Sequence, residues 1–278
     1  MMDNMAHRFP RRLVRTAAVL TSLTALAAGT AACSDDVETP LAANTGPEHL
    51  RAEVVDMLPF DEDSFTQGLE VDSRGHLLVS TGLQGQSRIY RRELDGDEVQ
   101  SVDLDPEFFG EGITQSGSNL WQLTWHDGVA IRRDAQTLEE TGRFDWPGEG
   151  WGICSLDDQT LVASDGSSRV RLLDSRDLTE VGHATVGGDD PVEGLNELEC
   201  VEGEVYANVF QTDRIVGFDP HTGSLTADID ASGLPNNAEP NVDNVLNGIA
   251  HKPASDHFYL AGKRWPDLYE VRFVPQDS

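Results

Sequence analysis

The stretch from 108 to 125 places an acidic side chain where chemistry is possible. It reads as two short strands joined by a turn at 115–119, with Glu111 on the first strand directly before a glycine and Trp125 ending the second. A charged side chain is rarely placed on an inner strand unless another group pairs with it or uses it. Glu111 is therefore either a reactive carboxylate or half of a buried ion pair, for which Lys263 is the candidate partner.

The three-residue pattern around Glu111 recurs along the chain. Its middle residues fall at 68, 112, 152, 197 and 248, so the spacings are 44, 40, 45 and 51. Each copy leads into an apolar strand, a turn and a third alternating strand, and no stretch has a sustained helical period. The copies are Gln67-Gly68-Leu69, Glu111-Gly112-Ile113, Trp151-Gly152-Ile153, Asn196-Glu197-Leu198 and Asn247-Gly248-Ile249.

Repeats of 40 to 50 residues with several strands each are typical of propellers. Five copies predict an all-β fold, a five-bladed β-propeller, in which a strand near 52–58 completes the last blade beside 268–274. Innermost strands line the axial channel, so the first residue of each copy is expected at one shared pocket. These residues are Gln67, Glu111, Trp151, Asn196 and Asn247. The alternative is that they bond one another and seal the channel.

The N-terminus has the pattern of an export signal. Residues 1–32 combine a basic region with a small apolar run at 17–28 and a small-residue cleavage site that ends before Cys33. This predicts export, with Cys33 as the lipid anchor of a bacterial cell-envelope lipoprotein or, without lipidation, a secreted protein. A soluble helix is the alternative, but nothing obvious would cover its apolar face. Residues 33–49 read as a flexible tether and 50–278 as the propeller.

The charge is strongly acidic, with a formal net charge of −29. Such a surface argues against nucleic acid and against anionic membranes, so membrane contact is expected only through the lipid anchor. We expect a monomer. Export would permit a disulfide between Cys154 and Cys200, but these residues lie one position out of phase in their repeats. Two buried free thiols are the alternative that this offset favours.

Ten short motifs, spread in order over residues 50 to 274, resemble the plant and bacterial glutaminyl-peptide cyclotransferases. They are Phe65-Thr66-Gln67-Gly68-Leu69, Ser80-Thr81-Gly82-Leu83, Phe109-Gly110-Glu111-Gly112, Gln122-Leu123-Thr124-Trp125, Gly150-Trp151-Gly152, Ser164-Asp165-Gly166-Ser167, Asn196-Glu197-Leu198-Glu199, Ala207-Asn208-Val209, Val245-Leu246-Asn247-Gly248-Ile249 and Gly262-Lys263-Arg264-Trp265-Pro266. The resemblance implies a five-bladed propeller that converts N-terminal glutamine of peptides and proteins to pyroglutamate with release of ammonia. It also implies that no catalytic zinc and no cofactor is needed.

The resemblance has three departures. The family usually has a glutamate where this chain has Val79, commonly an aromatic residue at Gln84 and a tryptophan at Phe210. The first removes a carboxylate and puts catalytic competence in question. The third departure keeps an aromatic side chain, because phenylalanine replaces tryptophan at position 210.

The chemistry that the resemblance implies assigns roles to the candidate residues. The attacking α-amine must lose a proton and the departing ammonia must gain one, so Glu111 is expected to shuttle it. Trp151, Asn196 and Lys263 are candidate donors to the carbonyl oxygen. Gln67, Trp125, Asn247 and Phe210 are expected to hold the substrate. On sequence grounds alone Lys263 is equally well a solvated turn residue, Trp265 reads as a buried anchor and His126 as an exposed turn residue.

Two other functions remain open. A calcium-dependent propeller hydrolase would use Glu111, Asn196 and Asn247 as oxygen ligands, but it has no use for Trp151 and Lys263. A non-catalytic propeller that binds a peptide at the channel mouth is favoured by the valine at position 79.

Overall fold

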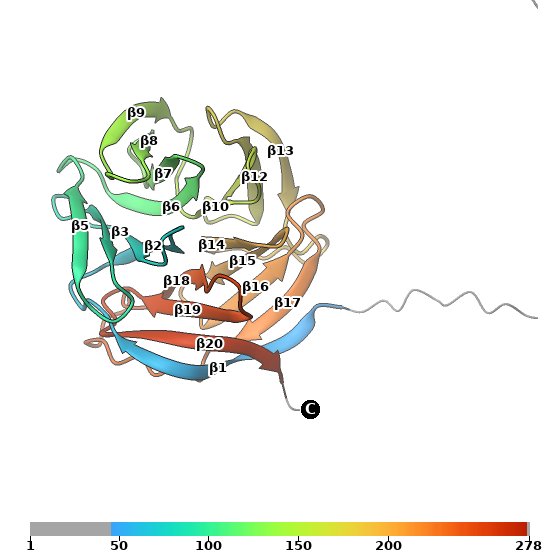
Figure 1. Ribbon diagram of the computed structural model, residues 1–278. Coiled ribbons are helices and arrows are strands. Elements are labelled where there is room, and N and C mark those ends of the chain that lie inside the picture. Colours follow the sequence, from blue (N-terminus) through green and yellow to red (C-terminus); the bar gives the residue numbers. More distant parts are fainter. Residues whose placement is uncertain (1–45, 277–278) are drawn as a thin grey trace, which may run out of the picture. The chain divides into compact units, whose positions relative to one another are not determined.

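The computed structural model describes residues 46–276, and in this part of the chain it contains twenty strands and no helix (Figure 1). Consequently, none of the described residues forms a helix that could cross a membrane. The predicted export signal, the proposed lipid anchor Cys33 and most of the predicted tether lie outside the described residues. The first strand begins at Glu48, slightly before the expected start at 50.

The strands follow one another in groups of four. The first groups are β2 (Thr66–Val71), β3 (Leu77–Thr81), β4 (Arg88–Arg92), β5 (Glu98–Asp103), β6 (Gly110–Ser116), β7 (Asn119–Thr124), β8 (Val129–Asp134) and β9 (Glu140–Asp145). Next come β10 (Ile153–Ser155), β11 (Thr160–Ala163), β12 (Arg169–Asp174), β13 (Glu180–Thr185), β14 (Leu195–Val201), β15 (Glu204–Val209), β16 (Arg214–Phe218) and β17 (Leu225–Asp230). The last group is β18 (Leu246–His251), β19 (His257–Gly262) and β20 (Asp267–Pro275), joined by β1 (Glu48–Pro59).

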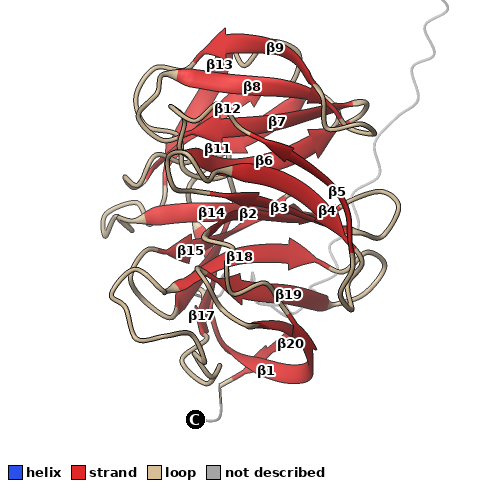
Figure 2. Cartoon of the chain, turned by 90° about the vertical axis from the view of Figure 1, so that its left-hand side faces the viewer, coloured by secondary structure: helices blue, strands red, loops and turns tan. Residues whose placement is uncertain are grey.

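The sheets are arranged around a common centre, as in a propeller (Figure 1), and Figure 2 shows the same strands from the side. Strands β2–β5, β6–β9 and β10–β13 form separate four-stranded sheets, and the remaining strands form one sheet in the order β14-β15-β16-β17-β1-β20-β19-β18. Strand β1 pairs antiparallel with β20, with Ala52 opposite Phe273 and Leu58 opposite Leu268. The predicted pairing of 52–58 with 268–274 is therefore confirmed.

Burial differs between the inner and outer strands of each sheet. The first four residues of the inner strand β2 are buried, whereas the outer strands β5 and β9 have no buried residue. Inner strands are covered on both faces, so that even polar side chains such as Thr66 and Gln67 are buried there. Outer strands carry charged side chains at their free edges, which discourages pairing with another chain.

Neighbouring inner strands are offset by one residue. A Cβ added to Gly152 would lie 2.9 Å from the backbone nitrogen of Leu198, and one on Gly112 would lie 2.9 Å from that of Ile153. Each glycine therefore faces the residue that follows the equivalent position of the next repeat. Only a residue without a Cβ permits this approach, which accounts for the repeated glycine.

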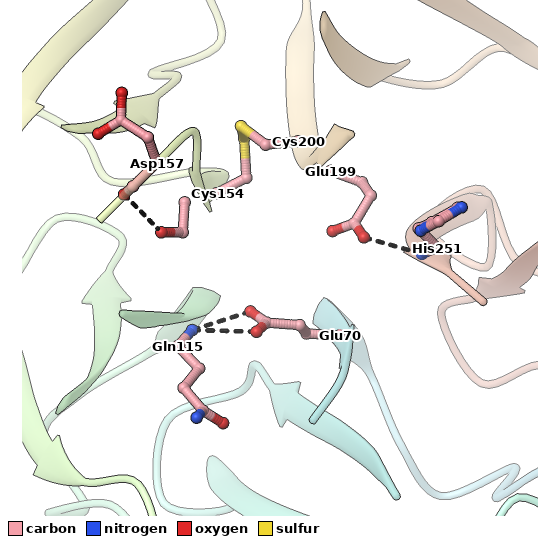
Figure 3. Close-up of a disulfide and its surroundings, with 8 residues drawn as sticks. Glu70, Gln115, Cys154, Asp157, Glu199, Cys200 and His251 are labelled. Atoms are coloured by element: carbon pink, nitrogen blue, oxygen red, sulfur yellow. Dashed lines mark hydrogen bonds between the residues drawn. A yellow bond between two sulfur atoms is a disulfide. The ribbon is translucent and has the colours of Figure 1, made fainter. Parts of the chain in front are cut away.

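The same offset brings Cys154 and Cys200 together in a disulfide, with their Cα atoms 5.4 Å apart (Figure 3). Cys154 lies two residues after Gly152 and Cys200 two residues after Leu198. The expectation of two free thiols was wrong, because the one-position difference in sequence is the difference that the offset cancels.

Three carboxylates lie near the disulfide end of the inner strands. Glu70 accepts the backbone N–H of Gln115, and Glu199 accepts that of His251 (Figure 3). Glu197 stands where the other repeats have glycine, and it accepts N–H groups from both Leu69 and Ile249. The side chain of Glu197 thus links three inner strands, β14, β2 and β18.

Candidate active site

The candidate site is built where the first strand of a sheet begins and the second strand ends. Because these two strands are antiparallel, the start of the first strand and the end of the second lie at the same end of the sheet. Glu111 is the second residue of β6, and Trp125 directly follows β7. Phe210 and Lys263 directly follow β15 and β19 in the same way.

A β-bulge or similar irregularity displaces the first residue in four of the five copies of the repeat. The pairing register shifts between Thr66 and Gly68, and again between Gly110 and Ile113. Equivalent shifts bracket Asn196 and Asn247. Bulges turn a side chain away from the regular alternation of a strand and often occur beside functional sites.

Seven of the eight residues predicted to form the site line one hollow of about 270 Å³. They are Gln67, Glu111, Trp125, Trp151, Asn196, Phe210 and Lys263, and the wall is completed by Phe65, Leu83, Phe109 and Asp243. The eighth, Asn247, does not line the hollow. It is fully buried and donates through Nδ2 to Gln67 Oε1 at 3.0 Å, so it holds Gln67 instead of facing a substrate.

Glu111 is buried, with 3% of its surface exposed. Its Oε1 accepts a hydrogen bond from Gln67 Nε2 at 2.9 Å, and its Oε2 has no partner among the described residues. Burial raises the pKa of Glu111 well above its usual range, the charge of Lys263 opposes this rise and that of Glu149 adds to it. A carboxyl group with a raised pKa and one unpartnered oxygen is suited to exchanging a proton with a ligand.

Lys263 is also buried, so it is not a solvated turn residue. Its Nζ lies 5.0 Å from the ring centre of Phe65 and 4.9 Å from that of Phe210. Burial lowers the pKa of Lys263, while the charge of Glu111 opposes this effect. Among the described residues Lys263 and Glu111 form no ion pair, so the two groups influence each other without closing the hollow between them.

Glu149 connects two aromatic walls of the hollow. Its Oε2 accepts the indole N–H of Trp125 and that of Trp151, each at 2.9 Å. The N–H that we expected to serve as a donor to the carbonyl oxygen is therefore engaged by Glu149 in this structure. Trp151 also packs edge-on against Phe210, with 5.4 Å between ring centres.

Asn196 is buried and lines the hollow, and its Oδ1 has no hydrogen-bond partner among the described residues. Its backbone carbonyl accepts the hydroxyl of Ser164, which also accepts the N–H of Gly152. The backbone of Asn196 is thus fixed while its amide group remains available to a ligand.

The reasoning from sequence missed Phe65, Phe109 and Glu149. Each lies two residues before a predicted site residue, namely before Gln67, Glu111 or Trp151. This shared two-residue spacing is the signal in the sequence that could have found them.

Val79, Trp265 and His126, which were also singled out in the sequence, lie in different surroundings. Val79 is fully buried in β3 opposite Leu69 and Tyr90, packed in the sheet core, and it does not line the hollow. Trp265 is buried as expected. His126 is exposed as expected and lies against Trp125, with ring centres 3.8 Å apart. In the described part of the chain, no three His, Cys, Asp or Glu side chains are grouped to hold a metal.

Comparisons with known proteins point to one family. The sequence model of the glutamine cyclotransferase family matches residues 22–273. A glutaminyl-peptide cyclotransferase of Arabidopsis thaliana is 35% identical over 227 residues, which cover 79% of this chain and 70% of the plant protein. The crystal structure of the Myxococcus xanthus glutaminyl cyclase superposes with a TM-score of 0.78 at 33% identity and covers 83% of this chain and 100% of the other. The chain belongs to the glutamine cyclotransferase family.

Proposed function

We propose that this protein converts the N-terminal glutamine of peptides and proteins to pyroglutamate and releases ammonia. The observation that carries the proposal is Glu111, a buried carboxyl group with a raised pKa whose Oε2 has no partner among the described residues, in a hollow walled by aromatic rings. Membership of the glutamine cyclotransferase family supports it.

The reaction needs one proton to move between two nitrogen atoms. The α-amine attacks the γ-carbonyl carbon of the same residue, a carbon–nitrogen bond forms, and the bond to the amide nitrogen breaks. Glu111 takes the proton that the amine loses and gives it to the amide nitrogen, which leaves as ammonia. A free α-amino group has a pKa of about 7.7 to 8.0, so a carboxyl group with a raised pKa exchanges a proton with it at little cost.

The other lining residues hold the substrate in a folded conformer. Since the reaction is intramolecular, the protein has to bring the amine and the carbonyl of one residue together, not two molecules. Lys263 and the amide of Asn196 stabilise the charge that develops on the carbonyl oxygen. Trp125, Trp151 and Phe210 exclude water, and Gln67 fixes the orientation of Glu111.

We also infer that the fold is a five-bladed propeller. The eight-stranded sheet divides naturally between β17 and β1, because these strands are parallel and pair over only four residues. Strand β1 pairs over nine positions with β20 and so completes a fifth four-stranded unit.

The structure weakens the argument for a non-catalytic binding role. That role was favoured by the missing carboxylate at Val79, and Val79 is packed in the sheet core away from the hollow. Glu111, by contrast, lines the hollow with Lys263 and Asn196.

Export, lipidation at Cys33 and a monomeric state remain proposals based on the sequence. If Cys33 is lipidated, the full chain should partition into the detergent phase of a two-phase extraction and a Cys33→Ala variant should stay in the aqueous phase. Equal partitioning of the two proteins would contradict the lipid anchor.

The proposed activity is tested with a glutamine-initiated dipeptide and a Glu111→Gln variant. The new side chain still accepts the N–H of Gln67 but cannot carry the proton, so kcat for ammonia release should fall about 100-fold or more with little change in KM.

Glu199→Gln is the control, since it makes the same change in a half-buried glutamate outside the hollow whose pKa is also raised by burial. It should leave kcat unchanged. Equal rates in wild type and Glu111→Gln would remove Glu111 from the mechanism, and peptide binding without any ammonia would favour the binding role.

A further inference from the structure

A second hollow adjoins the proposed active site. It has a volume of about 310 Å³ and shares Leu83, Phe109 and Trp125 with the first hollow. A third hollow nearby shares only Leu83 with the first. When an N-terminal glutamine occupies the first hollow, the rest of the peptide has to leave through its mouth, and the second hollow is the neighbour with the largest common wall.

The common wall is a rigid aromatic surface. Trp125 is 37% exposed, and its ring is fixed by the hydrogen bond to Glu149 and by contact with Phe109, 5.5 Å away between ring centres. His126 lies against Trp125 and also lines the second hollow. The face of an indole attracts a guanidinium or an ammonium group.

The charged groups around this wall are mainly acidic. Asp127 lines the second hollow, and only its Oδ2 accepts a hydrogen bond from the described residues, the backbone N–H of Phe109 at 2.9 Å. The half-exposed Glu149 has its Oε1 3.7 Å from His126 Nδ1. No lysine or arginine is among the residues that line this hollow, and Lys263 is buried in the first.

We propose that the hollow formed by Leu83, Gln84, Phe109, Trp125, His126 and Asp127 is the subsite for the second residue of the peptide, and that it prefers a basic side chain there. This inference rests on the proposed cyclisation activity and names its preferred substrates. A lysine or arginine in this position contacts the exposed part of the Trp125 indole beside His126 and lies near Asp127 and Glu149. A glutamate in this position is repelled by the same two carboxylates.

The test compares ammonia release from three peptide amides, Gln-Lys-amide, Gln-Leu-amide and Gln-Glu-amide. We expect kcat/KM to decrease in that order, with about tenfold between the lysine and glutamate peptides at low salt. The ratio should shrink when the salt concentration is raised, because the charges lie near the surface.

Asp127→Asn and Glu149→Gln keep a hydrogen-bond acceptor but remove a charge, so each should reduce the lysine-to-glutamate ratio several-fold. Glu62→Gln is the matched control, since Glu62 lines only the third hollow, and it should keep the wild-type ratio. Equal kcat/KM for the three peptides, or an unchanged ratio in both acidic-site variants, would overturn the subsite while leaving the cyclisation activity in place. No ammonia from any of the peptides would overturn the proposed function and this subsite together.

Discussion

At the scale of single residues, the site combines two buried ionisable groups that do not neutralise each other by contact. Glu111 and Lys263 both line the hollow, and each moves the pKa of the other toward the charged form. If the two groups formed a buried ion pair in direct contact, neither would be free to interact with a substrate. Separation keeps a carboxyl group available for proton transfer and a cation available for a carbonyl oxygen.

The effect of Lys263 on the pKa of Glu111 can be measured from the pH profile of kcat/KM. Lys263→Met removes the cation that lowers the pKa of Glu111, so the pKa of Glu111 should rise further. Because the carboxylate form acts as the base, the acidic limb of the kcat/KM profile should move to higher pH. Loss of the donor to the carbonyl oxygen should reduce kcat about 100-fold.

Lys252→Met is a suitable control, since these two are the only lysines and Lys252 is paired with Glu270 at 2.7 Å outside the hollow. The control should show the wild-type profile. An unshifted acidic limb in Lys263→Met would mean that the limb does not report Glu111.

Most of the site could be predicted from sequence because one register recurs. The repeat identified Gln67, Glu111 and Asn196 without any structural information, and all three line the hollow. It placed Asn247 there as well, although this side chain turns to Gln67. The sequence also predicted the indole N–H of Trp151 as a donor to the substrate. In the structure this N–H binds Glu149, and nothing in the repeat indicates that contact.

At the scale of elements, the offset between neighbouring inner strands decides which residues meet. It depends on glycine at the point of closest approach, and it explains why Cys154 reaches Cys200. The order and type of the strands follow from alternation and turn residues in the sequence. The offset cannot be predicted from these sequence features, because it is set by how one sheet packs on the next.

A methyl group at Gly152 tests this explanation. In Gly152→Ala the Cβ would lie 2.1 Å from the backbone oxygen of Asn196 and 2.9 Å from the backbone nitrogen of Leu198, and neither atom can move freely. We expect a loss of at least about 3 kcal/mol in the free energy of unfolding, measured with urea.

Gly142→Ala is the control. Gly142 lies in the outer strand β9, and an added Cβ would be 3.5 Å from its nearest neighbour, so this variant should change the free energy of unfolding by less than about 1 kcal/mol. Equal stability of the two variants would show that the inner strands tolerate a wider spacing.

At the scale of the whole molecule, acidic groups accumulate at the disulfide end of the inner strands. Burial raises the pKa of Glu70 to about 8, and those of Glu197 and Glu199 well above their usual range. Among the described residues none of the three forms an ion pair with a basic side chain. The folded protein therefore holds more protons than the unfolded chain between about pH 4.5 and 8.

Stability should fall as the pH rises through this window, because the unfolded chain loses these protons first. Glu70→Gln removes one of the groups, so its loss of unfolding free energy between pH 5 and 8 should be smaller than in wild type. We expect a difference of about 2 kcal/mol, reduced from the full shift because Glu70 is only half-buried.

The same pH series on Glu139→Gln, a change at an exposed position, controls for the general acidity of the chain. Identical pH dependence in Glu70→Gln and wild type would exclude Glu70 from this effect.

The pairing of β1 with both β20 and β17 has a consequence for how the chain reaches its native state. Leu50 and Pro275 are partners although nearly the whole described chain separates them, so β1 is synthesised before the other described strands and acquires its neighbours last. Contacts between such distant segments form slowly, and until they form the backbone groups of β1 are open to other chains. Premature termination anywhere before β20 would thus leave a long unpaired strand exposed, and aggregation is the expected fate of such fragments.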